Sequence, residues 1–211
     1  MALDEALLVY APAGSLILRY YRWAGPALTF GYSQPYAAAA AAARARAVAP
    51  AAVVRRATGG GIVFHDGDLT FSLSFPWPRL SPPLMIYAKI HGGVLAGLRQ
   101  LGIAAQSWSP PAGAPQERQV QCFTGPEPYD LTDGRGRKIL GGALRRRLSR
   151  GLYQGSLRLE GGRRPDLEAA MTAGLTREWG REPSQGLGAA CLEQAEKLAG
   201  KYESEVWNRR R

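Results

Sequence analysis

The sequence predicts a single domain of the α+β class, in which pairs of strands joined by turns are interrupted by helices. Segments that alternate or cluster apolar and aromatic residues, as strands do, stand between segments whose apolar residues recur at three- and four-residue steps, as in helices. Glycine and proline mark many of the boundaries between these segments. With 211 residues and 45% apolar content, the chain can bury one sizeable core.

The amino-terminal part predicts a helix, two strands and a second helix. Residues 3–8 favour a short helix, and residues 15–21 and 27–32 have the composition of strands, with a Gly-Pro pair at 25–26 in the turn between them. Residues 37–49 are rich in alanine and favour a helix by propensity alone.

The middle of the chain predicts three strands and the longest helix. Residues 53–54 and 62–64 are short apolar runs on either side of three glycines, and residues 69–75 alternate Leu and Phe with polar residues, which predicts a half-buried strand. Residues 84–101 carry apolar residues on one helical face. His91 lies on that face, so we expect a core histidine there rather than a catalytic one.

The carboxyl-terminal half predicts a loop, a hairpin with a third strand beside it, and two helices. Five prolines and few periodic apolar residues mark residues 107–128 as an irregular loop. Residues 129–132 and 138–144 are expected to pair around an Asp-Gly turn, with residues 151–159 alongside. The other expectations are helices at 165–174 and 189–202, the second burying Leu192, Ala195 and Leu198, and a Trp207 that packs rather than binds.

Residues 55–66 are the most informative segment, because they combine two arginines, three consecutive glycines, a short apolar run and a His-Asp pair. Glycines permit positive φ and let a ligand approach bare backbone N–H groups, and Arg55 and Arg56 add cationic donors. No GxGxxG or GxxxxGK[ST] is present, and the flanking apolar runs favour strand-turn-strand. We therefore expect a ligand site here, but neither a dinucleotide-binding nor a P-loop fold.

Charge and cysteine content narrow the classes of function. The net charge of +10, from 27 basic and 17 acidic residues, implies a positive potential that recruits an acidic partner. The basic residues are scattered and lack a nucleic-acid-binding motif, so we do not expect nucleic acid. Two cysteines without zinc or disulfide spacing indicate no metal and fit a reducing cytoplasm. No apolar run approaches the roughly 20 residues of a membrane helix, so no membrane association is expected.

The glycine segment resembles the RRxSGGGxVxHD signature of the lipoate-protein ligase and octanoyltransferase superfamily, with Thr58 where serine is usual. Residues 136–143 are similar to the GRKxxGSA motif of this family. Residues 154–157 are similar to its HGSLL or HGTLL motif, with Gln154 in place of histidine. Two weaker similarities lie near the amino terminus, to the family patterns LAxEE at residues 3–6 and GxxQ at residues 29–34.

The resemblance implies the biotinyl/lipoyl-protein-ligase architecture, a mixed β-sheet with flanking helices on its outer side. It further implies one catalytic domain over residues 1–211, without the accessory carboxyl-terminal domain that many ligases carry.

Cys122 is a candidate nucleophile. A free cysteine is more often a small buried hydrophobe, but Pro126 and the polar neighbours of Cys122 favour exposure. A nearby ammonium would lower the pKa of the thiol and supply the thiolate that acyl transfer needs. Residues 122–131 resemble the CFxxPxxYEL segment of octanoyltransferases of the LipM type, with Asp130 for glutamate, and Cys122 aligns with their catalytic cysteine.

The resemblance implies Lys138 as the second catalytic residue, which would orient the acyl carbonyl, stabilise charge on its oxygen, and activate the cysteine or the incoming amine. Val63 and Phe64 are expected in the wall of an apolar tunnel for the acyl chain. His65 would border the thioester end of this tunnel, although a purely structural role is equally open. The implied substrate-binding residues are Arg55, Arg56, Thr58, Gly59, Gly60, Gly61, His65, Asp130, Gly141, Gly142, Ala143, Gln154 and Gly155.

The activity implied by the resemblance is that of an octanoyl-[acyl-carrier-protein]:protein N-octanoyltransferase without metal or cofactor. Octanoate would pass from octanoyl-acyl carrier protein to Cys122, and then to a lysine of a lipoyl-domain protein. Both partners are acidic in the usual case, so the positive charge would steer them. Two alternatives stay open. One is an ATP-dependent lipoate- or biotin-type ligase, with Mg²⁺ and triphosphate contacts from Arg55 and Arg56. The other is a non-catalytic carrier-binding relative.

Overall fold

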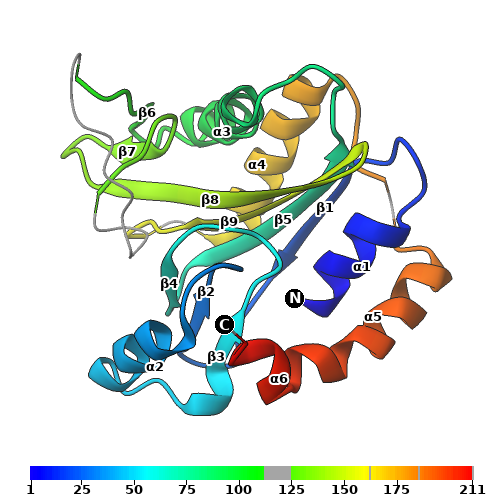
Figure 1. Cartoon of the computed structure of the whole chain (residues 1–211). Helices are drawn as coiled ribbons and strands as arrows, with labels where there is room; N and C mark the ends of the chain where they lie inside the picture. The colour runs from blue at the N-terminus through cyan, green and yellow to red at the C-terminus, as the bar shows by residue number, and fades with distance from the viewer. Residues whose placement is uncertain (112–124, 162, 185, 211) are drawn as a thin grey trace.

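The computed structural model describes residues 1–111, 125–161, 163–184 and 186–210. Its strands form a six-stranded sheet of order β1-β5-β9-β8-β7-β6 and a three-stranded sheet of order β3-β2-β4, with helices around both (Figure 1). The prediction of an α+β fold with flanking helices is confirmed. The large sheet is antiparallel throughout, and the small sheet is mixed because β2 runs parallel to β3 and antiparallel to β4.

The strands coincide with the apolar and alternating segments of the sequence. In the large sheet they are β1 (Ile17–Tyr21), β5 (Leu69–Pro76), β9 (Arg150–Leu157), β8 (Lys138–Arg147), β7 (Leu131–Asp133) and β6 (Ala105–Ser107). In the small sheet they are β2 (Ala27–Phe30), β3 (Val53–Arg55) and β4 (Ile62–His65). The predicted hairpin is β7–β8, and β9 lies beside β8 as expected.

Helices cover both faces of the large sheet (Figure 1). On one face, α3 (Pro83–Gln100) and α4 (Arg164–Trp179) enclose the main core, which includes Phe71, Leu73 and Tyr153. On the other face, α1 (Ala2–Tyr10) contacts β5 and β9, and α5 (Ala189–Glu203) packs on α1. The short α6 (Glu205–Asn208) follows α5, and α2 (Tyr36–Ala45) packs on the small sheet.

One expectation about the strands was wrong. The strand at 69–75 is buried on both faces rather than half-buried, because α1 covers its polar side, where Ser72 Oγ donates to Asp4 Oδ1 at 2.6 Å. The two strands predicted on either side of the Gly-Pro segment are present as β1 and β2, and they belong to different sheets. Strand β1 pairs with β5 in the large sheet, whereas β2 is the central strand of the small sheet.

The structure also decides two packing expectations. The prediction that α5 buries Leu192, Ala195 and Leu198 was wrong, because Leu192 is 44% exposed and the other two are only partly buried. This helix buries Cys191 and Tyr202 instead. Trp207 is buried, and its Nε1 donates to the Arg55 carbonyl, as expected of a packing residue.

His91 is a core histidine, as predicted. It is 1% exposed and hydrogen-bonded to the Tyr129 carbonyl and to the Tyr153 hydroxyl, both at 2.7 Å. Across the described ranges, the helices are all too short or too polar to cross a membrane.

Candidate active site

The glycine-rich segment connects β3 to β4, which lie on opposite sides of β2. Gly60 has a φ of +83°, and its carbonyl occupies the space that a Cβ on Gly31 would need, so both positions require glycine. The Arg56 side chain fixes the loop by hydrogen bonds to its backbone carbonyls. Its Nη2 donates to the carbonyls of Gly59 and Gly61, both at 2.9 Å, and its Nη1 donates to Thr29 Oγ1 at 2.8 Å.

Arg55 faces away from this loop, contrary to the expectation that it binds substrate. Its side chain is 1% exposed, and its five N–H groups donate to five backbone carbonyls at 2.8–3.1 Å. A guanidinium has five N–H donors, so none is left for a ligand. The acceptors belong to Tyr32, Gln34, Trp207, Asn208 and Arg210. Arg55 therefore fastens the α6 region to the small sheet.

A narrow cavity of about 30 Å³ lies where the two sheets face each other. Residues 141–143 of β8 and residues 154–156 of β9 line one side, and the strand register places them directly opposite one another. Thr29, Val63 and His65 of the small sheet line the other side. The cavity thus joins three sequence motifs that are far apart in the chain. The predicted site residues in its wall are Arg56, His65, Gly141, Gly142, Ala143, Gln154 and Gly155.

Some predicted residues lie outside this wall. Phe64 was expected beside Val63 in the tunnel, but it packs toward α2, where the Arg46 guanidinium lies 4.1 Å from its ring. Adjacent strand residues point to opposite faces, so only Val63 reaches the cavity. The glycines at 59–61 shape the loop instead of lining the cavity.

Gln154 links the glycine loop to α1. Its Oε1 accepts a hydrogen bond from Thr58 Oγ1 at 2.7 Å, and its Nε2 donates to Asp4 Oδ2 at 2.7 Å. Asp4 is fully buried and also receives hydrogen bonds from Ser72 and Arg19. Thr58 therefore contacts the cavity wall through Gln154. Asp4 was missed by the sequence interpretation because its partners lie up to 150 residues away.

Lys138 and Asp130 form a buried ion pair. Lys138 Nζ lies 2.6 Å from Asp130 Oδ2, and the two side chains are 5% and 6% exposed. Burial raises the pKa of Asp130, although Lys138 and the backbone N–H of Glu127 oppose this rise. The Lys138 side chain lies against Gly141, where a Cβ would collide with its Cε. Because Gly141 lines the cavity, the ammonium lies next to a residue of the cavity wall.

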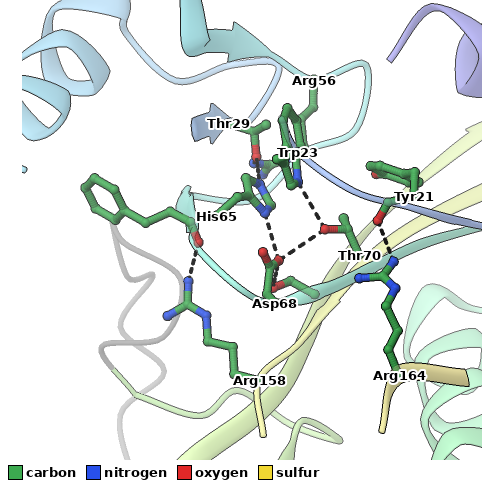
Figure 2. Close-up of polar contacts among 11 residues, drawn as sticks. Tyr21, Trp23, Thr29, Arg56, His65, Asp68, Thr70, Arg158 and Arg164 are labelled. Carbon is green, nitrogen blue, oxygen red and sulfur yellow. Dashed lines mark hydrogen bonds and ion pairs between the residues drawn. The ribbon is translucent and has the colours of Figure 1, made fainter. Parts of the chain in front are cut away.

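His65 is the centre of a second polar network, shown in Figure 2. Its Nδ1 lies 2.8 Å from Asp68 Oδ2, its Nε2 lies 2.8 Å from Thr29 Oγ1, and its ring stacks on Trp23 with centroids 4.4 Å apart. Asp68 Oδ2 also accepts from Ser156 Oγ at 2.6 Å. The sequence interpretation did not identify four residues of this network, namely Thr29, Asp68, Ser156 and Trp23. The one local signal that could have indicated the network was an acidic residue three positions after His65.

The network shifts the pKa of both ionisable partners. Burial lowers the pKa of His65, although its contact with Asp68 opposes this, so the imidazole is neutral at pH 7. Burial would raise the pKa of Asp68, but the hydrogen bonds from His65 and Ser156 together hold it below its ordinary value. A neutral histidine therefore faces an ionised carboxylate.

Cys122 lies outside the described residues, so its expected place beside Lys138 stays a prediction. The other cysteine, Cys191, is buried at 2% exposure between α5 and α1, where it packs against Leu7 and Ala11.

Residues 1–173 match the model of the lipoyl protein ligase A/B catalytic domain. Octanoyltransferase LipM of Carboxydothermus hydrogenoformans is 38% identical over 152 residues, which cover 70% of this chain and 55% of the relative. Octanoyltransferase LipM of Moorella thermoacetica is 35% identical over 166 residues, which cover 74% of this chain and 59% of the relative. The chain thus spans less than two thirds of the length of these relatives.

Solved structures agree with the family match. A lipoate-protein ligase A bound with ATP superposes with a TM-score of 0.79 at 20% identity, covering 99% of this chain and 92% of the other. A bi-partite lipoate protein ligase from Thermoplasma acidophilum gives a TM-score of 0.75 at 21% identity, with coverages of 99% and 89%. Such identities establish the fold alone. Together with the family match, they show that the chain belongs to the lipoyl protein ligase A/B catalytic-domain family.

Proposed function

We propose that this protein is an octanoyltransferase that moves octanoate from octanoyl-acyl carrier protein to a lysine of a lipoyl-domain protein. The relatives named octanoyltransferase support this proposal, because they match most of the chain at 35–38% identity. The convergence of the three motifs on one cavity supports it as well.

The observation that carries the proposal is the buried Lys138–Asp130 pair beside Gly141 of the cavity wall. A surface lysine of a hairpin would be solvated, whereas this ammonium is fixed by a carboxylate at 2.6 Å. A fixed cation at this position can polarise an acyl carbonyl and stabilise the charge that develops on its oxygen. It can also favour a thiolate over a thiol.

The reaction proceeds in two acyl transfers. In the first, the thiolate of Cys122 attacks the thioester carbonyl, a new C–S bond forms, and the carrier thiolate leaves and takes up a proton. In the second, the ε-nitrogen of the acceptor lysine attacks the Cys122 thioester, an amide forms, and the sulfur leaves as thiolate. The amine proton passes to a base. The cavity has room for only about two water molecules, so its walls must separate to admit an octanoyl chain.

No ATP or Mg²⁺ enters this scheme, because a thioester donor is already activated. The ligase alternative assigned triphosphate contacts to Arg55 and Arg56, but all five N–H donors of Arg55 are engaged by backbone carbonyls. The net charge of +10 would steer acidic carrier and lipoyl domains toward the protein. A cytoplasmic location fits these partners.

Intact-mass analysis tests the proposal. The protein incubated with octanoyl-acyl carrier protein, without ATP, should gain one octanoyl group that hydroxylamine removes. Cys122→Ser should gain none. Cys191→Ala should gain the group normally, and alanine is the better control because a serine hydroxyl buried at that apolar position would cost about 1–3 kcal/mol.

Three results would contradict the proposal. A requirement for ATP with free octanoate or lipoate as donor would indicate a ligase. Binding of the carrier without any adduct would indicate a non-catalytic relative. Equal octanoyl adducts in both cysteine variants would show that Cys122 is not the nucleophile.

A further inference from the structure

We propose that Thr29, His65 and Asp68 form a proton relay that takes the proton from the attacking lysine amine during acyl transfer. This inference rests on the proposed function and assigns the base that its second step needs. His65 Nε2 is the catalytic proton acceptor, the Thr29 hydroxyl passes the proton, and Asp68 positions the imidazole (Figure 2).

The hydrogen-bond partners determine the tautomer of His65. Asp68 is ionised and can only accept, so the Nδ1 of His65 carries the proton that it donates to Oδ2 at 2.8 Å. Arg56 can only donate, so Thr29 Oγ1 accepts from Arg56 at 2.8 Å and keeps its own proton for His65 Nε2 at 2.8 Å. The network therefore leaves Nε2 unprotonated, with its lone pair directed at the Thr29 hydroxyl.

The relay opens onto the acyl cavity. Thr29 and His65 both line that cavity, on the side opposite residues 141–143 and 154–156. His65 and Asp68 also line a second, open pocket of about 410 Å³, which includes Trp23 and Asp66. The imidazole thus stands between the proposed acyl site and a pocket that reaches the surface, where a proton can be released after each turnover.

Asp68 is arranged to stabilise an imidazolium. Its Oδ2 is within hydrogen-bond distance of His65, Ser156 and Thr70, whereas its Oδ1 is buried and has no partner among the described residues. A buried acceptor without a hydrogen-bond partner is unfavourable, and protein folds usually avoid one. The hydroxyl donors therefore do not fully compensate the negative charge of the Asp68 carboxylate. The positive charge of a protonated His65 would compensate the rest.

The proton transfers balance as follows. The lysine nitrogen bonds to the acyl carbon, and the C–S bond of the thioester breaks with its electron pair on sulfur. The nitrogen loses a proton to Thr29 Oγ1 while Thr29 gives its own proton to His65 Nε2. The charged groups facing the imidazole are Asp68, which favours its protonation, and Arg56 and Arg158, which oppose it. The resulting imidazolium then returns its proton to solvent or to the thiolate.

A single-turnover experiment on isolated octanoyl-protein separates the two acyl transfers. The octanoyl group is offered either to a lipoyl domain or to hydroxylamine, which is largely unprotonated at neutral pH and needs less help from a base. His65→Gln and Thr29→Val should slow transfer to lysine by roughly 100- to 10,000-fold. They should change octanoyl loading and hydroxylamine cleavage far less.

Matched variants distinguish the relay from a structural role. Thr29→Ser keeps the hydroxyl and should transfer to lysine much faster than the isosteric Thr29→Val. His91→Gln is the matched control, because it removes the other of the two histidines of the chain. Any loss of rate in this variant should affect octanoyl loading and transfer to lysine equally. Free imidazole should partly restore transfer in His65→Gly. Asp68→Asn should move the acid limb of the transfer rate to lower pH, because the carboxylate no longer supports the imidazolium.

Two outcomes would overturn the relay while leaving the proposed function intact: equal rates in Thr29→Val and Thr29→Ser, or parallel losses of loading and transfer in His65→Gln. A wild-type protein that acquires no octanoyl group would overturn both proposals.

Discussion

The ammonium of Lys138 lies 2.6 Å from the carboxylate of Asp130, and the two side chains are almost completely removed from water. A buried pair of this kind contributes little net stability, yet removing one partner leaves an uncompensated charge. Asp130 immediately precedes β7 and Lys138 is the first residue of β8, so the hairpin brings them together. The pair therefore connects the fold of the hairpin with the chemistry proposed for the site.

Lys138→Ala should lower both stability and activity. The unpaired Asp130 carboxylate should cost about 3–5 kcal/mol in the free energy of unfolding, measured by urea denaturation. The loss of a preorganised cation should slow octanoyl transfer by roughly 100- to 1000-fold. The double variant Lys138→Met/Asp130→Asn removes both charges and should recover most of the stability without the activity. Recovery of activity in the double variant would show that Lys138 acts only through the fold.

Arg55→Lys should destabilise the protein without weakening substrate binding. Lysine keeps the charge but has three donors on a flexible stem, and it cannot serve five carbonyls. We expect a loss of about 1–3 kcal/mol in the free energy of unfolding. Arg56→Lys is the matched comparison, because Arg56 lines the cavity and should change KM. If Arg55→Lys instead had a raised KM and an unchanged free energy of unfolding, Arg55 would be a substrate-binding residue.

His91 should make the protein sensitive to mild acid. Burial lowers the pKa of His91 to about 4, against 6.5 in the unfolded chain. The unfolded state therefore binds more protons between these values, and stability that is present above pH 6.5 is lost as the pH falls toward 4. The difference corresponds to roughly 3 kcal/mol.

The measurement compares unfolding of wild type and His91→Asn from pH 7 to pH 4. Asp68, Glu5 and His65 also have lowered pKa values and add their own acid sensitivity, but they are present in both proteins. The wild type should lose roughly 3 kcal/mol more than the variant. Parallel curves would contradict the assignment.

Much of the fold could be predicted from local sequence patterns. The helix at 84–101 follows from apolar spacing, and the strand at 69–75 follows from alternation, because these periods directly reflect which face is buried. The burial of the second face of that strand could not be predicted, because α1 covers this face through a contact between residues 4 and 72. Likewise, β2 was placed correctly as a strand, but its pairing with β3 and β4 could not be predicted, because pairing depends on segments far along the chain.

The same division holds within the candidate site. The motifs at 55–66, 136–143 and 154–157 were enough to indicate the family and most of the cavity wall, because each motif is contiguous in the sequence. Only the tertiary structure decided that Arg56 faces the cavity while Arg55 binds the backbone of residues up to 155 positions away. Only the tertiary structure placed Asp68, Thr29 and Ser156 around His65. Local sequence determines which backbone a segment adopts, whereas the direction and partners of a side chain are decided when distant segments pack together.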